Sequence, residues 1–72
     1  MKVRKVQALI YIFRILLEKG YIKKKDIQET ISLQDVAFRR YIQELRAYLL
    51  NFNEPYEIIY NKGEDIYLLK KI

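Results

Sequence analysis

Apolar residues recur at helical spacing in the second half of this chain. Phe38, Ile42, Leu45 and Leu49 follow one another at intervals of four, three and four, which places them in one stripe along a helix. The pattern predicts a helix with one buried face that ends between Asn51 and Asn53. The opposite face of this helix carries polar side chains: Gln34, Asp35, Arg39, Arg40 and Gln43.

A first helix is predicted from Val3 to Lys19, with Gly20 as its stop signal. Its apolar arc spans roughly 220°, whereas one helix in a small core needs about 100°. We therefore expect burial on two sides and predict self-association, most simply a homodimer, around Ile12 and Ile15. The expected central stripe of this helix consists of Val6, Leu9, Phe13 and Leu16.

The segment between these helices is short and rich in lysine. Tyr21 and Ile22 favour a short extended piece, and a two-turn helix is expected from Lys24 or Lys25 to Ile31. Ser32, followed three residues later by Asp35, resembles a capping pair for the next helix. Two packed helices that present an arginine-bearing face are the outline of a DNA-binding helix-turn-helix.

The pattern changes to strand-like after Pro55. The segments 57–60 and 66–69 are rich in β-branched, aromatic and aliphatic residues, and residues 61–64 between them supply turn chemistry. This part predicts a β-hairpin. The expected fold class is therefore α+β: three helices followed by a two-stranded hairpin, which is the element order of a winged helix-turn-helix.

Cysteine and histidine are both absent, which excludes disulfides and removes the usual zinc ligands and the commonest general base. No glycine-rich phosphate loop or metal-ligand cluster is present either, so we expect no enzyme activity and no cofactor. The apolar run from Ala8 to Leu17 contains Arg14 and is about half the length of a membrane span. With no recognisable signal peptide, residues 1–72 are expected to form one cytoplasmic domain.

The net charge of +5 is distributed unevenly. Residues 1–25 carry eight Lys or Arg and one Glu, whereas residues 26–72 carry six Lys or Arg and eight Asp or Glu. Such asymmetry suits a polyanion such as nucleic acid or an acidic membrane surface, although it also promotes solubility alone.

The run from Ser32 to Arg46 resembles the turn and recognition helix of bacterial regulators of the deoxyribose-operon-repressor and biotin-repressor types. Arg40, Ile42 and Leu45 match the Arg, Ile and Leu of that pattern, and Phe38 takes its apolar position. The strand at residues 66–69 resembles the wing strand of the same domains. The resemblance implies a DNA-binding domain of a transcription regulator, with the third helix in the major groove of double-stranded DNA.

On this basis the candidate DNA contacts lie in three places. The helix residues Arg39, Arg40, Gln34 and Gln43 are candidates for base or phosphate contact, and Asp35 is either a base contact or a cap. Three lysines near the second helix are candidate phosphate contacts or a solubility cluster: Lys23, Lys24 and Lys25. Lys62 in the hairpin turn is a further candidate, although Glu64 and Asp65 beside it would repel phosphate.

The alternative function is a protein interaction module that uses the same fold and its wide apolar surface without contacting DNA. Ala37, which stands where the family often has a DNA-contacting Thr, and the acidic hairpin turn favour this alternative.

Overall fold

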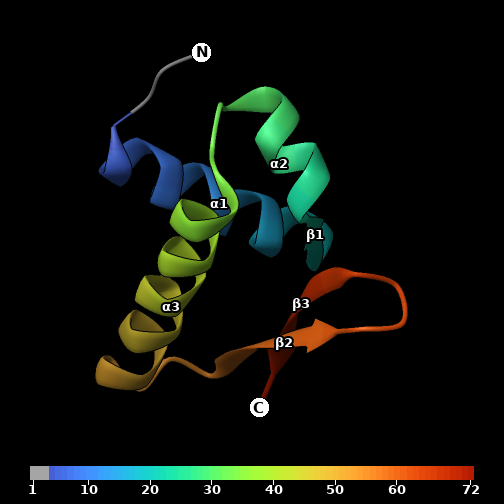
Figure 1. The fold of residues 1–72 in the computed structure, drawn as a ribbon. Helices are drawn as coiled ribbons and strands as arrows, with labels where there is room; N and C mark the ends of the chain where they lie inside the picture. Colours follow the sequence, from blue (N-terminus) through green and yellow to red (C-terminus); the bar gives the residue numbers. More distant parts are fainter. Residues whose placement is uncertain (1–3) are drawn as a thin grey trace.

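The computed structural model describes residues 4–72, which form an α+β arrangement (Figure 1). Within these residues there are three helices and one three-stranded antiparallel sheet. The predicted helix start at Val3 lies outside the described residues; the other predicted helix bounds are confirmed to within one or two residues. The elements in chain order are α1 (Lys5–Lys19), β1 (Tyr21–Lys23), α2 (Lys24–Thr30), α3 (Asp35–Asn51), β2 (Tyr56–Asn61) and β3 (Ile66–Lys71).

The core lies where the three helices and the sheet meet, and it is built from aliphatic side chains with one phenyl ring. Phe38 is fully buried, and its ring meets that of Tyr67 edge to face with the ring centroids 5.4 Å apart. The stripe predicted for α3 is confirmed in full. The buried core residues are Ala8, Ile12, Leu16, Ile22, Ile27, Ile31, Phe38, Ile42, Leu45, Leu49 and Ile58.

The stripe predicted for α1 is only partly confirmed: Leu16 is fully buried and Leu9 and Phe13 are partly buried, but the centre of the buried face is shifted. Ala8, Ile12 and Leu16 form the buried line, whereas Val6 is 65% exposed. The apolar arc is wide enough to hold several stripes, and contacts with β1, α3 and β3 select one of them. The dimer surface predicted around Ile12 and Ile15 is therefore also wrong, because Ile12 is fully buried and Ile15 packs against the core.

Gly20 ends α1 as predicted. Its φ of 83° lies in the left-handed region that glycine adopts readily, and its N–H donates to the Leu16 carbonyl at 2.8 Å. This sharp change of direction lets β1 begin one residue later and places Tyr21 and Ile22 in the sheet.

The capping pair predicted at the start of α3 is not formed. Gln34 is the N-cap residue, no side chain caps the helix, and Asp35 occupies the first turn instead. Residues 32–34 are not helical, so Ser32 lies too far before the helix for its hydroxyl to act as the cap.

The predicted hairpin is confirmed as β2 and β3, but the sheet has three strands and not two. Its order is β1-β3-β2, with Ile22 and Tyr60 both opposite Tyr67. Strand β1 covers the edge of β3 that a two-stranded hairpin would leave unpaired. As a result the short segment after α1 ties the hairpin to the helices, and the hairpin lies next to α3 (Figure 1).

Candidate nucleic-acid interface

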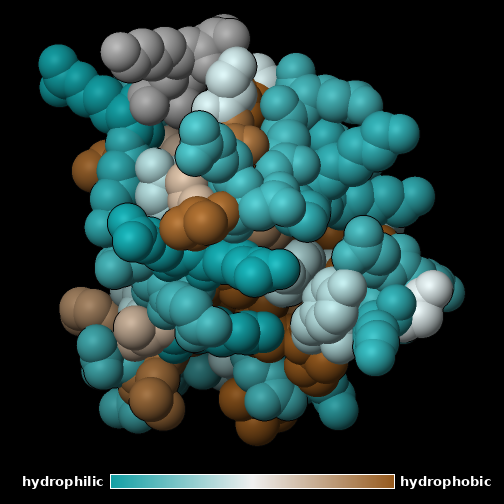
Figure 2. Space-filling view, viewed as in Figure 1, coloured by the Kyte–Doolittle hydropathy of each residue, from teal (hydrophilic) through white to brown (hydrophobic). Residues whose placement is uncertain are grey.

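The exposed face of α3 carries the predicted polar residues. Arg39, Arg40 and Gln43 are exposed, whereas Phe38 and Ile42 on the same helix are buried. Successive residues turn by about 100° around a helix, so the polar group faces away from the core. The three polar residues share one surface hollow of about 400 Å³. Hydrophilic side chains predominate over α2 and the first part of α3 in Figure 2, whereas apolar ones gather toward the end of α3.

The rim of this hollow nearest to α1 holds an ion pair. The Lys5 Nζ atom lies 3.7 Å from a Glu44 carboxylate oxygen, and both side chains are more than half exposed. The hollow also includes Val36, which is 60% exposed. The exposed side of α3 therefore combines positive charge with a small apolar contact, a composition suited to a DNA groove that presents both hydrogen-bonding edges and thymine methyl groups.

A second hollow, of about 250 Å³, separates α3 from the hairpin and contains residues that the sequence did not single out as DNA contacts. Arg46 joins Arg39 and Gln43 there, and its Nε donates to the Ile58 carbonyl of β2 at 3.3 Å. The opposite wall holds Tyr60 and Tyr67, whose ring centroids are 4.9 Å apart.

The sequence did contain a signal for Arg46. Arg39, Gln43 and Arg46 follow one another at intervals of four and three, which is the spacing of one helical strip. Arg46 is therefore on the same side of α3 as the two predicted residues. No comparable pattern marked Tyr60, because its position facing α3 depends on how the hairpin packs.

The three predicted lysines do not form one cluster. Lys23 lines a separate hollow with Lys19 and Asp26, and Lys25 is exposed on α2. Only Lys24 reaches α3, where its Nζ lies 3.5 Å from Asp35 Oδ2. Lys24 is thus the member of the group that lies beside the candidate interface, and its charge already has a partner there.

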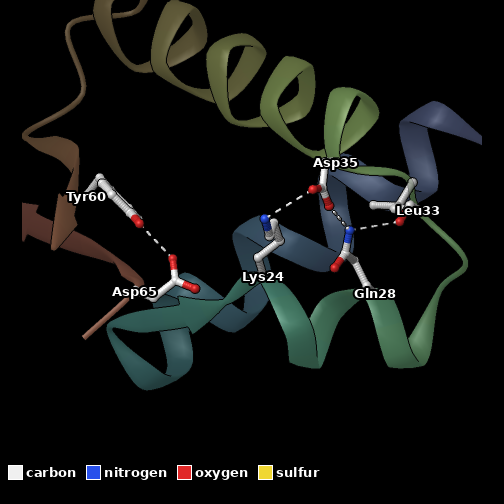
Figure 3. Close-up of polar contacts among 6 residues, drawn as sticks. All are labelled: Lys24, Gln28, Leu33, Asp35, Tyr60 and Asp65. Atoms are coloured by element: carbon white, nitrogen blue, oxygen red, sulfur yellow. Dashed lines mark hydrogen bonds and ion pairs between the residues drawn. The ribbon is translucent and has the colours of Figure 1, made fainter. Parts of the chain in front are cut away.

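Asp35 is held by two groups from α2 (Figure 3). Gln28 Nε2 donates to Asp35 Oδ1 at 2.7 Å and to the Leu33 carbonyl at 3.0 Å. The hydrogen bond from Gln28, followed by the charge of Lys24, lowers the pKa of Asp35 below its ordinary value of 3.8. The carboxylate therefore remains charged at neutral pH and joins α2 to the first turn of α3.

The hairpin turn has its own polar contacts. The Tyr60 hydroxyl donates to Asp65 Oδ1 at 2.7 Å, and the Glu64 N–H donates to the Asn61 side chain at 3.2 Å. Asp65 adopts a φ of 54°, in the left-handed region that Asp tolerates better than most residues. Lys62 is exposed at the tip beside these acidic residues, so the tip itself has no excess of positive charge.

Away from this face, one side of α1 exposes a strip of apolar side chains. Val6, Ile10 and Leu17 of α1 are 65%, 62% and 51% exposed. A hollow of about 340 Å³ between the two helices includes Val6, Ile10 and Tyr48. Tyr48 meets Phe13 of α1 edge to face, with the ring centroids 6.1 Å apart. This apolar strip is distinct from the polar face of α3.

None of the helices in residues 4–72 combines the length and apolar character needed to cross a bilayer. Comparison of the chain with protein-family models, with curated proteins and with solved structures finds no match.

Proposed function

We propose that the chain is a winged helix-turn-helix domain that binds double-stranded DNA in a cytoplasmic transcription regulator. In this proposal α2 and α3 form the helix-turn-helix, α3 enters the major groove, and the β2–β3 hairpin is the wing. The backbone of the DNA passes over the hollow between α3 and the hairpin.

The observation that carries this proposal is the strip of Arg39, Gln43 and Arg46 along α3, of which Arg39 and Gln43 are exposed and Arg46 is partly buried, with the exposed Arg40 beside it. Guanidinium groups bind guanine edges or phosphate oxygens in a bidentate manner, and a glutamine amide matches adenine. The buried stripe of Phe38, Ile42, Leu45 and Leu49 runs next to this strip, one residue earlier at each step, and fixes the helix to the core. The strip is therefore presented on a rigid support.

Selection from a random duplex library, with affinity measured as salt is varied, tests the proposal. We expect enrichment of a defined site and an affinity that falls linearly on logarithmic axes as salt rises, because phosphate contacts release counterions. Absence of both enrichment and salt dependence would contradict DNA binding.

The exposed apolar side chains of α1 favour a second candidate function, which is protein binding. The apolar strip of Val6, Ile10 and Leu17 is the kind of surface that binds another protein. The alternative is therefore an interaction module that uses this strip and does not contact DNA. The same selection separates the two functions, since a pure interaction module yields no enriched duplex.

We also propose that the strip pairs with a second copy of the chain. Val6, Ile10, Phe13 and Leu17 are spaced by four, three and four residues along α1, the repeat of a seam that two helices share. A two-fold dimer would present two α3 helices to a palindromic site.

Sedimentation at micromolar concentration tests the dimer. We expect Leu17→Glu to shift the parent from dimer to monomer, because it places a charge in the seam. The matched control is Leu50→Glu, since Leu50 is 78% exposed on α3 outside the strip. A parent that sediments as a monomer contradicts the dimer.

A further inference from the structure

At the corner between α2 and α3, Lys24 is paired with the carboxylate of Asp35. Lys24 is the one of the three predicted lysines that reaches α3. Lys24 Nζ lies 3.5 Å from Asp35 Oδ2, and the Lys24 side chain is only 26% exposed. The other carboxylate oxygen accepts a hydrogen bond of 2.7 Å from Gln28 (Figure 3). Each oxygen of Asp35 therefore has its own partner on α2.

Gln28 gives this arrangement a fixed geometry. Its amide nitrogen also donates to the Leu33 carbonyl, in the connection that leads into α3. The carboxylate is thereby held in place for Lys24 before any ligand arrives. A phosphate that approached Lys24 would have to compete with a carboxylate that is already positioned and charged.

Asp35 also feels the charge of one cation of α3 itself. Arg39 lies one helical turn further along, and its charge contributes to the lowered pKa of Asp35. Asp35 is thus a negative charge that acts on both Lys24 of α2 and Arg39 of α3.

We infer that Asp35 limits the affinity of this interface for the DNA backbone by engaging Lys24, and that it does not contact a base. This inference rests on the proposed DNA-binding function. It differs from the expectation that Lys24 simply contacts phosphate, because the ammonium becomes available only when Asp35 is neutral or absent.

The variant Asp35→Asn tests the inference with almost no change in shape. The asparagine oxygen still accepts from Gln28, but the charge that holds Lys24 is gone. We expect tighter binding to both the selected site and a random duplex. The salt slope should steepen by about 0.9, so the gain in affinity should shrink about 3.5-fold between about 50 mM and about 200 mM salt.

Two controls separate this effect from a general change in net charge. Glu18→Gln removes the same charge from α1, where Glu18 also has a basic partner, Arg14, at 2.9 Å. We expect it to leave the salt slope unchanged. In a Lys24→Gln background, Asp35→Asn should no longer steepen the slope, because the cation that it releases is missing. Circular dichroism of each variant establishes that it is folded.

Three results would overturn the inference. Loss of affinity for the selected site alone, with unchanged binding to random duplex, would show that Asp35 contacts a base. Equal slopes for the parent and Asp35→Asn would show that the ion pair does not restrain Lys24. If the folded parent binds no duplex at all, the proposed function fails, and this inference fails with it.

Discussion

The two faces of α3 differ in what they contact, although both belong to one helix of 17 residues. The inner face is apolar and almost inaccessible: Phe38 is fully buried and Ile42 is 2% exposed. The outer face carries Arg39 and Arg40, which are exposed and project away from the core. Because core packing depends on the inner side chains and ligand contact on the outer ones, we expect stability and binding to respond to different substitutions.

The outer face also differs along its length. At its start, Asp35 is paired with Lys24 and Gln28, so positive charge there is reduced. Further along, Arg46 is anchored through its Nε to the hairpin backbone. The interface that we propose is therefore strongest in the middle of α3, and weaker at the α2–α3 corner than the lysine run in the sequence indicated.

The largest expected effect is on the inner face. Phe38→Ala should lower the free energy of unfolding by about 3 to 5 kcal/mol, because it removes a buried ring and leaves a cavity. Urea unfolding followed by circular dichroism measures this loss.

Val36→Ala is the matched control on the outer face. Val36 is 60% exposed, so its truncation should change stability by less than about 0.5 kcal/mol. If Phe38→Ala proves too unstable to fold, Ile42→Val, expected to cost about 0.5 to 1.5 kcal/mol, makes the same comparison. Equal effects at Val36 and Phe38 would contradict the division of the helix into two faces.

The next effect is on binding. Arg40→Ala should weaken binding to a selected duplex by about 1 to 3 kcal/mol, through loss of a guanidinium contact. Its stability should remain within about 0.5 kcal/mol of the parent, because the side chain is exposed.

Arg14→Ala provides the control for Arg40. Arg14 is an exposed arginine of α1 that pairs with Glu18 and lies outside the proposed interface. We expect it to alter duplex affinity much less than Arg40→Ala does. Similar losses for the two variants would mean that net charge, and not the position on α3, determines binding.

The sequence predicted α3 well because its apolar stripe is narrow and has only one possible orientation. For α1 it predicted Leu16 but not Ala8 and Ile12, because several stripes fit the same wide apolar arc and contacts with β1, α3 and β3 select one of them. The hairpin was predictable from its strand-like segments and turn. Strand β1 was predicted only as an extended piece at Tyr21 and Ile22, because its pairing with β3 is a long-range contact.

The candidate interface, too, was predictable from the sequence only where helical spacing alone determines it. Arg39, Arg40 and Gln43 were predictable, since helical spacing alone places them outside the buried stripe. The contacts of Asp35 with Lys24 and Gln28 were not predictable, because they depend on the angle at which α2 meets α3. Sequence order made three neighbouring lysines look equivalent, whereas the fold directs only Lys24 toward α3.

The smallest expected effect concerns the hairpin. There the carboxylate of Asp65 accepts a hydrogen bond from the neutral Tyr60 hydroxyl, whereas Asp35 is paired with the cation Lys24. The hydrogen bond to Asp65 raises the pKa of Tyr60 above its ordinary value of 10.0, because the neutral hydroxyl is the donor. A raised pKa in the folded state means that this bond stabilises the fold below the unfolded pKa of Tyr and ceases to do so as pH rises through the folded pKa. Tyr60→Phe should therefore be slightly less stable than the parent at neutral pH, and the difference should begin to shrink near pH 10 and vanish above the raised pKa of the folded state. Urea unfolding on both sides of that pH measures it, with Tyr21→Phe on β1 as the exposed control. A stability difference that stays constant across this range would show that the hydroxyl of Tyr60 contributes by packing and not by donating to Asp65.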